Sequence, residues 1–216
     1  MSILDLINFD KQFNKIIIGT DEAGRGPAAG GVYAAAVCFG EKEISKNLIK
    51  DLEILNDSKK LTPKKRESIY DSILLNTLNK IVRIEVDEIE KINILNSSLK
   101  AMNIACMEIA GKYDNTLTLV DGNKLIKNYI YPQQCVIKGD SKSASIAAAS
   151  ILAKVTRDRY MLKLQDEFPM YNWANNAGYL TKEHMEAIDK FGLTKYHRPS
   201  FLRKHFEAKQ LSLILK

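Results

Sequence analysis

Four carboxylic acids stand where short apolar runs of the sequence end. Asp21 and Glu22 follow the run IIIGT, Asp121 follows LTLV, and Asp140 follows CVIKG. The ends of neighbouring strands converge in α/β sheets, and sites form there. Clustered carboxylates repel one another unless a cation lies among them, and oxygen ligands suit Mg²⁺ or Mn²⁺. Two such ions about 3.5–4 Å apart can activate a water and stabilise the leaving oxygen of a phosphodiester.

The spacing of these acids does not by itself decide for a metal site. Asp and Glu are also common turn and cap residues at strand ends, and Asp121, which precedes Gly122, fits that alternative. Successive strand residues face opposite sides of a sheet. The adjacent Asp21 and Glu22 are therefore expected to share a site only if their strand ends there.

The segment Gly24-Arg25-Gly26 comes directly after the first two acids. It is not a dinucleotide fingerprint, which would need Gly in place of Ala29, nor a P-loop, because no Gly-Lys-Ser/Thr follows. One interpretation is a tight turn that needs positive φ. The other is that glycine lets the backbone approach a ligand while Arg25 contacts a phosphate, and the sequence leaves both open.

The basic residues fall into three clusters. Any one cluster would ordinarily be a solvated face, but two lie beside the acids or the Ser-rich turn at 141–145, which favours a phosphate track. Tyr179 lies in a Gly-flanked loop, where local packing and a stacking platform are both open. The clusters are Lys59, Lys60, Lys64, Lys65 and Arg66; Lys138, Lys142, Lys154, Arg157, Arg159 and Lys163; and Lys195, Arg198, Arg203 and Lys204.

Composition indicates an ordinary globular protein with a basic excess. The 216 residues predict one domain with an appendage, and 45% hydrophobic with 27% charged residues argues against disorder. The net charge of +6 favours a polyanionic partner. The three cysteines form no CxxC pair and are expected to be buried free thiols. The longest apolar stretch, 144–153, is far short of the ~20 residues of a membrane span, and the N-terminus lacks a signal-peptide pattern, so we expect a cytoplasmic protein.

The elements that must position these residues alternate between strand and helix. Strands are predicted at 15–20, 31–39, 80–86, 116–120 and 135–137. Helices are predicted at 62–78, 95–111, 143–168 and 181–191. This order predicts an α/β fold: a mixed β-sheet flanked by helices, with a C-terminal helical extension.

Taken in order, the motifs closely resemble those of the ribonuclease HII family. The opening motif is Gly19-Thr20-Asp21-Glu22-Ala23-Gly24-Arg25-Gly26-Pro27. Later motifs are Asp57-Ser58-Lys59-Lys60-Leu61, Val120-Asp121-Gly122, Lys138-Gly139-Asp140-Ser141-Lys142-Ser143, the stretch 148–155 with Arg157-Asp158, Gly178-Tyr179 and His197-Arg198. The opening string alone is suggestive, whereas the ordered series, from about residue 15 to 205, is highly specific.

The resemblance implies a ribonuclease H-like sheet in a single catalytic domain, residues 1–216. The core would span about 14–168, and a helical substrate-binding segment would span about 169–216. It implies a metal-dependent endonuclease that cleaves the RNA strand of RNA–DNA hybrids and nicks DNA 5′ to embedded ribonucleotides. The products would carry 3′-hydroxyl and 5′-phosphate ends, and two Mg²⁺ or Mn²⁺ ions would take part.

The resemblance also implies roles for particular residues. The catalytic metal ligands would be Asp21, Glu22, Asp121 and Asp140. Gly24, Arg25 and Gly26 would recognise the ribonucleotide 2′-OH and the junction. Tyr179 would stack on the sugar of the following deoxynucleotide. Backbone phosphates would be held by Lys59, Lys60, Ser141 and Lys142.

The chain departs mildly from the family pattern. Family members often read GPLAGPV where this chain has PAAGGV at 27–32, a change that concerns packing behind the motif. Asp158 is a rival fourth ligand, but Asp140 is preferred because an ion pair within the predicted helix explains Asp158. Only about 15 residues precede the first strand, which disfavours the related ribonuclease HIII with its extra N-terminal domain.

Two other classes of function stay open at this point. One is a different metal nuclease on the same fold, such as a transposase or Holliday-junction resolvase. The other is a non-catalytic nucleic-acid binder with a decayed site, although all four acids are present. A histidine ribonuclease is disfavoured, because His184, His197 and His205 lie away from the acidic motifs. We expect a monomer that binds RNA–DNA hybrid and ribonucleotide-containing duplex DNA. No clamp contact is expected, because residues 210–216 lack the aromatic pair of a clamp-binding peptide.

Overall fold

Five strands form one mixed sheet in the computed structural model, which describes residues 2–40, 44–55 and 61–214, with side chains up to residue 207. The strands are β1 (Ile16–Ala23), β2 (Val32–Cys38), β3 (Leu78–Ile84), β4 (Thr116–Asp121) and β5 (Gln133–Val136). Their order across the sheet is β3-β2-β1-β4-β5. Strands β1, β2 and β3 pair antiparallel, whereas β4 pairs parallel with β1 and β5. The predicted mixed sheet is confirmed.

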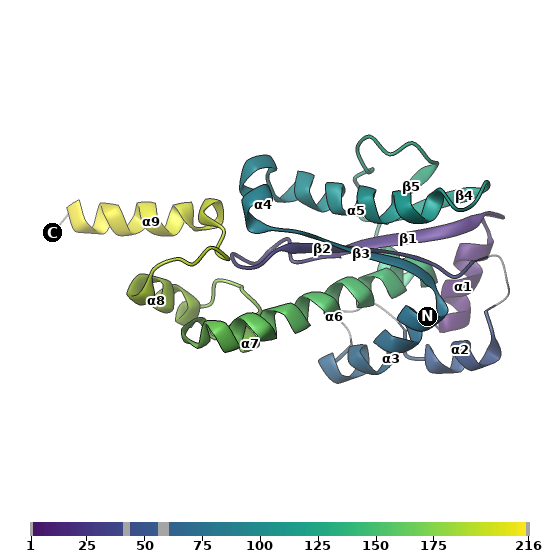
Figure 1. The fold of residues 1–216 in the computed structure, drawn as a ribbon, viewed down its shortest axis with the longest axis horizontal. Coiled ribbons are helices and arrows are strands. Elements are labelled where there is room, and N and C mark those ends of the chain that lie inside the picture. Colours follow the sequence, from purple (N-terminus) through teal and green to yellow (C-terminus); the bar gives the residue numbers. More distant parts are fainter. Residues whose placement is uncertain (1, 41–43, 56–60, 215–216) are drawn as a thin grey trace.

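Helices cover both faces of this sheet (Figure 1). One face carries α4 (Val86–Ile92) and α5 (Ile94–Ala110). The other face carries α1 (Ile3–Lys11), α2 (Lys46–Asp51), α3 (Pro63–Asn76) and the long α6 (Ala144–Glu167). Beyond one end of the sheet lie α7 (Trp173–Asn176), α8 (Lys182–Phe191) and α9 (Pro199–Ile214), the predicted C-terminal helical extension.

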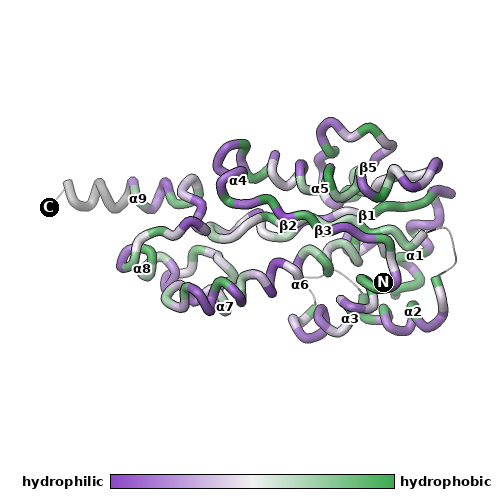
Figure 2. Tube along the Cα trace, viewed as in Figure 1, coloured by the Kyte–Doolittle hydropathy of each residue, from purple (hydrophilic) through white to green (hydrophobic). Residues whose placement is uncertain are grey.

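The side chains of β1 alternate between the two helical layers. Ile18 belongs to the hydrophobic cluster formed with α5, whereas Ile17 packs with Ile146 of α6. Alternation of this kind is the rule for an extended strand buried on both faces. Figure 2 shows hydrophobic residues along the central strands and hydrophilic residues on the outer turns of α2 and α3. The core therefore lies in two layers, one on each side of the sheet.

The first turn of α6 packs directly on the backbone of β1. A Cβ atom added to Gly19 would lie 2.1 Å from the carbonyl carbon of Ser145 and 2.2 Å from the amide nitrogen of Ile146. Helix α1 holds the same turn, because the Ser145 N–H donates to Oδ2 of the buried Asp10 at 2.9 Å. Gly19 thus permits the close approach that registers α6 against β1.

Several predicted boundaries are wrong, and some helices were not predicted. Strand β1 continues three residues past the predicted end at residue 20, because Asp21, Glu22 and Ala23 pair with β2. The helix expected to reach residue 78 ends at Asn76, and β3 begins at Leu78. Helices α1, α2 and α4 were not predicted, since helices of six to nine residues show little periodicity.

The cysteines and the helix lengths bear on two further expectations. Cys38, Cys106 and Cys135 form no disulfide bond; the first two are buried, whereas Cys135 is half-buried. No helix in the described part of the chain combines the length and the hydropathy that crossing a bilayer requires.

Replacing Gly19 by alanine is expected to destabilise the fold strongly. Overpacking commonly costs about 1–3 kcal/mol, and the methyl group would meet rigid backbone rather than a side chain that can rotate away, so we expect about 3 kcal/mol or more. Gly111→Ala is the matched control, because Gly111 has a helical φ of −65° and its added Cβ would lie 3.3 Å from the Tyr131 hydroxyl and 3.6 Å from the Met107 carbonyl oxygen. Urea denaturation measures both, and equal midpoints would contradict the close approach.

Candidate active site

Asp21 and Glu22 lie where β1 extends beyond its parallel neighbour. The pairing of β1 with β4 stops at Thr20 and Val120, while Asp21 and Glu22 still pair with β2. The two side chains point to opposite faces: Asp21 hydrogen-bonds Ser150 of α6, and Glu22 lines a cavity against α5. The sequence predicted that the two residues could share a site only if the strand ended there. Strand β1 instead continues to Ala23, and the two residues lie along the part of its edge that is not paired with β4.

Asp21 is a buried acid among like charges. The residue is 7% exposed, and its pKa is raised well above the usual value. Burial is the largest cause, and the negative charges of Glu22 and Asp121 raise the pKa further. Hydrogen bonds from Ser150 and from the Glu22 N–H, which lies 2.7 Å from Oδ1, oppose this shift. The structure therefore brings three of the four predicted acids within electrostatic reach of one another.

The fourth acid lies on a turn that is tied to the third. Asp121 ends β4, and its Oδ1 accepts a hydrogen bond from the Gly139 N–H at 2.6 Å. Asp140 follows within the short 3₁₀ turn Gly139–Ser141 and is buried. The Ser141 hydroxyl donates to the Lys138 carbonyl at 2.9 Å, so it caps its own turn. Lys142 comes next and is half-buried.

A small cavity joins two of the acids to cationic side chains. Its volume is about 120 Å³, and its polar lining includes Glu22, Arg25, Asp121 and Lys124. Nη1 of Arg25 lies 3.0 Å from Oε1 of Glu22, and half of the Arg25 side chain is exposed. The arrangement can hold an anionic group against Arg25 and Lys124 while the carboxylates stay close by.

The glycine loop, residues 24–31, meets the segment that carries Tyr179. A Cβ atom on Gly26 would lie 3.0 Å from Cε1 of Tyr179, whose side chain is 53% exposed. Gly24 has a φ of +98°, so the tight turn that was one interpretation is present. The structure thus places Gly26 and Tyr179, far apart in the chain, on one surface.

Two buried histidines lie beneath Tyr179. The Thr194 N–H donates to Nδ1 of His197 at 2.9 Å, which leaves the His197 proton on Nε2. That Nε2 lies 3.2 Å from Nε2 of His184, whose Nδ1 then donates to the Tyr179 carbonyl at 2.9 Å. Burial, with the neighbouring His184, lowers the pKa of His197 to about 4. Both rings are neutral, and they support the Tyr179 loop from the interior.

Two of the three basic clusters contain arginines that are neither exposed to solvent nor available to bind phosphate. Arg157 and Arg198 are buried and donate to backbone carbonyl groups. Arg159 pairs with Glu67 instead. Lys59 and Lys60, two of the expected phosphate ligands, lie outside the described residues.

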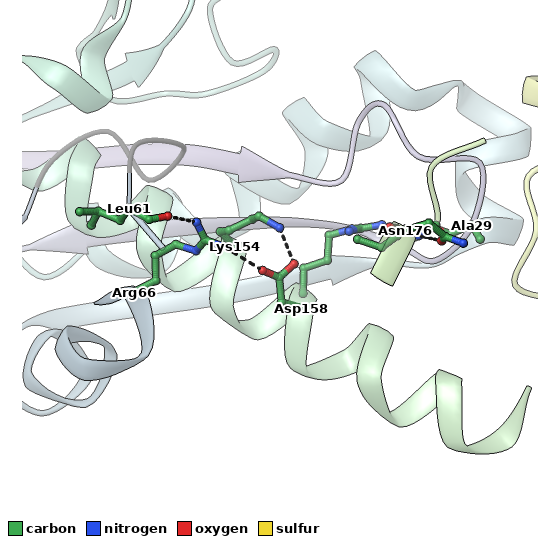
Figure 3. A network of polar contacts seen from close by, with 9 residues as sticks. Ala29, Leu61, Arg66, Lys154, Asp158 and Asn176 are labelled. Carbon is green, nitrogen blue, oxygen red and sulfur yellow. Dashed lines mark hydrogen bonds and ion pairs between the residues drawn. The ribbon is translucent and has the colours of Figure 1, made fainter. Parts of the chain in front are cut away.

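Asp158 forms the ion pair that the sequence predicted for it. Its carboxylate accepts from Lys154 one helical turn earlier, and Oδ2 lies 3.6 Å from Nη2 of Arg66 (Figure 3). Arg66 also donates to the Leu61 carbonyl at 2.6 Å. These contacts account for Asp158 without a metal.

Four residues around the site have structural roles that the sequence analysis did not assign to them. Ser150 and Lys124 contact the acids or their cavity, and Arg157 and Arg198 hold the glycine loop. For Arg157 a signal existed: it lies seven residues after Ser150 on one helix, hence on the same face. Ser150 and Arg198 lie within motifs that resemble those of the family, whereas Lys124 carries no such signal.

The donor set fits a hard divalent cation by its chemistry. Within residues 2–40, 44–55 and 61–214, no three His, Cys, Asp or Glu side chains form a ready metal-binding group. Asp21 nevertheless experiences the repulsion of two neighbouring carboxylates in a buried position. A cation relieves such repulsion, and carboxylate oxygens are the ligands that Mg²⁺ and Mn²⁺ prefer.

The chain is similar to known proteins in both sequence and structure. The family model described as Ribonuclease HII matches residues 18–209. Ribonuclease HII of Pelagibacter ubique is 50% identical over 187 residues, covering 87% of this chain and 96% of that protein. Ribonuclease HII of Rickettsia akari is 46% identical over 199 residues, covering 92% and 97%. The crystal structure of ribonuclease H2 from Pyrococcus horikoshii superposes with a TM-score of 0.67 at 26% identity, covering 87% and 95%.

Asp21→Asn is expected to stabilise the protein when a chelator is present. The substitution removes a buried charge that Glu22 and Asp121 repel, so the unfolding free energy at pH 7 should rise by more than the roughly 0.5 kcal/mol scatter of neutral surface changes. The control is Asp158→Asn, which removes a partly exposed ion pair and should lower stability by about 1 kcal/mol or less. Urea unfolding in EDTA compares them, and a destabilised Asp21→Asn would contradict the repulsion.

Acid is expected to weaken the histidine pair before it protonates the folded rings. His197 has its ordinary pKa of 6.5 in the unfolded chain and about 4 in the fold. Between these values the unfolded chain binds the extra proton, so stability is complete above pH 6.5 and falls as the pH drops, by at most about 1.4 kcal/mol per pH unit. NMR of the His197 ring tests the cause, and a folded-state midpoint at pH 6 or above would contradict it.

Proposed function

The chain belongs to the ribonuclease HII family of endonucleases, which act on RNA–DNA hybrids and leave 5′-phosphate products, and we propose that its activity depends on Mg²⁺ or Mn²⁺. Asp21, Glu22, Asp121 and Asp140 are the proposed ligands of two ions. The observation that carries this proposal is the burial of Asp21 beside the charges of Glu22 and Asp121. Without a cation, that arrangement is electrostatically unfavourable.

The proposed substrate includes duplex DNA with a single embedded ribonucleotide, nicked on its 5′ side. Gly24, Arg25 and Gly26 would read the 2′-OH, the group that distinguishes RNA from DNA. Tyr179 would stack on the sugar of the next nucleotide. The contact between Gly26 and the half-exposed Tyr179 ring supports this, since a ligand held by one would reach the other.

The mechanism divides the work between the ions and the side chains. Held by Asp21, Glu22, Asp121 and Asp140, two divalent ions would supply water activation and charge stabilisation at the leaving oxygen. The Gly139 N–H holds the Asp121 carboxylate in one orientation, and the Ser150 hydroxyl does so for Asp21. Arg25 balances the charge of Glu22 and has further N–H groups for a phosphate oxygen.

The 2′-OH serves as a recognition group and not as the nucleophile. Attack by the 2′-OH would need a general base, for which histidine is the usual choice. The buried His184 and His197 bond each other and the backbone in this protein, and their pKa values are lowered by burial. This observation supports direct hydrolysis with 3′-hydroxyl and 5′-phosphate ends.

The remaining expectations complete the proposal. We propose one catalytic domain that works as a monomer on hybrids and on ribonucleotide-containing duplex DNA. Lys59, Lys60, Ser141 and Lys142 would contact the phosphate backbone.

Cleavage of a DNA duplex with one ribonucleotide tests the proposal. We expect a single nick 5′ to the ribonucleotide in Mg²⁺, with 3′-hydroxyl and 5′-phosphate ends, and no cleavage in EDTA or of an all-DNA duplex. Asp21→Asn should lower kcat by about 100-fold or more, since even residues that only orient metal ligands contribute about 10–100-fold. Asp158→Asn, the matched control on α6, should stay within a few-fold of wild type. A 2′,3′-cyclic phosphate product, or full activity in EDTA, would overturn the mechanism.

A further inference from the structure

Arg198 holds the glycine loop by its backbone. Its Nε and Nη2 donate to the Gly30 carbonyl at 2.8 and 2.6 Å, and its Nη1 donates to the Pro27 carbonyl at 2.8 Å. The same Nη1 lies 3.5 Å from the carbonyl oxygen of Arg25. One planar guanidinium therefore constrains several residues of the loop at once.

Arg157 joins the glycine loop to the segment that leads into Tyr179. Its Nη2 donates to the Ala29 carbonyl at 3.2 Å and to the Ala177 carbonyl at 2.9 Å. A Cβ atom on Gly24 would lie 2.4 Å from Nε of Arg157, so the loop backbone lies directly on the guanidinium. Figure 3 labels Ala29 and Asn176 at the far end of this network from Leu61 and Arg66.

Backbone hydrogen bonds join the same two segments. The Ala28 N–H donates to the Gly178 carbonyl at 2.9 Å, and the Arg198 N–H donates to the Ala28 carbonyl at 2.7 Å. The Asn176 side chain accepts from the Gly178 N–H at 2.8 Å. The glycine loop and the Tyr179 loop are thus one hydrogen-bonded unit, and the buried side chains of Arg157 and Arg198 donate to its backbone carbonyl groups.

Burying two arginines here is electrostatically expensive. Neither guanidinium has a carboxylate within ion-pair distance in the described part of the chain. The charge of Arg157 disfavours that of Arg198, while Asp158 and Glu90 favour the charges of Arg157 and Arg198 from farther away. Burial, followed by the charge of Arg157, lowers the pKa of Arg198 to about 9. Buried charges of this kind are costly to stability, whereas a guanidinium offers five donors in a fixed plane. The gain is geometric, because it holds several carbonyl groups in place.

Helix α6 links this unit to the acids. Ser150 bonds Asp21, and Arg157 lies seven residues further on the same face, about 10 Å along the axis. Gly19 and Asp10 register the start of the helix. The helix therefore sets the distance between the Asp21 carboxylate and the glycine loop.

We propose that Arg157 and Arg198 are positioning residues that determine selectivity for a ribonucleotide. They hold the glycine loop and Tyr179 as one rigid surface at a set distance from Asp21, so that a 2′-OH is read at the position where the bond is cut. This inference rests on the proposed function of that loop. Neither residue touches the substrate in this role; each acts through the backbone it holds.

Binding without catalysis separates selectivity from general affinity. Fluorescence anisotropy in EDTA compares a duplex DNA that carries one ribonucleotide with the same duplex in all-DNA form. Arg157→Lys and Arg198→Lys keep the charge but leave one nitrogen where the carbonyl groups need several donors. We expect the preference for the ribonucleotide to fall about tenfold or more, with all-DNA affinity within about twofold of wild type.

Arg159→Lys is the matched control, because Arg159 is an exposed arginine on α6 that pairs with Glu67 and, within the described part of the chain, forms no hydrogen bond or ion pair with the glycine loop. It should leave both affinities unchanged. The two test variants lie in different parts of the chain and are made separately. Thermal unfolding shows whether each variant is folded, and either folded variant is sufficient to test the positioning role.

The outcomes distinguish the two proposals. Folded lysine variants that keep the wild-type preference would overturn the positioning role. Equal weakening of both duplexes would also overturn it, since that result indicates a general loss of the binding surface. A wild-type protein with no preference for the ribonucleotide would instead overturn the proposed function of the glycine loop.

Discussion

Repulsion between buried carboxylates is the constraint on which the site depends. Asp21 is buried on β1 beside the charges of Glu22 and Asp121, and its pKa is raised as a result. Folding tolerates this because Ser150 and the Glu22 N–H donate to the same carboxylate. The rest of the site supplies what such a cluster attracts: cationic side chains at its edge, and ligand oxygens suited to a divalent ion.

Helix α6 contacts both the buried acid Asp21 and the glycine loop, and so fixes their relative positions. Its first turn lies on the backbone of Gly19, its middle contacts Asp21 through Ser150, and Arg157 further along holds the glycine loop. Close packing at Gly19 leaves little freedom for the helix to slide. A single helix, many of whose residues are buried, thus relates the acids to the loops that would read the substrate.

The sequence predicted the elements with strong local signals and missed those without. The Thr62 cap of α3 and the Ser143 start of α6 are confirmed, because capping residues act within one turn. The end of β1 was placed three residues early, since its extension depends on pairing with β2 and not on its own residues. Arg157 and Arg198 were assigned to phosphate tracks because burial of a charged residue leaves no local pattern.

The amino-acid sequence by itself determined the family, the mixed α/β class and the candidate acids, because ordered motifs and strand-end residues are local features of the chain. Only the tertiary structure decided which side chains meet. It placed Asp21 against Ser150 and Asp121, and it stacked the glycine loop on two arginines that lie more than a hundred residues away in the chain. The physical reason is that burial and repulsion depend on distance in space, which residue order does not express.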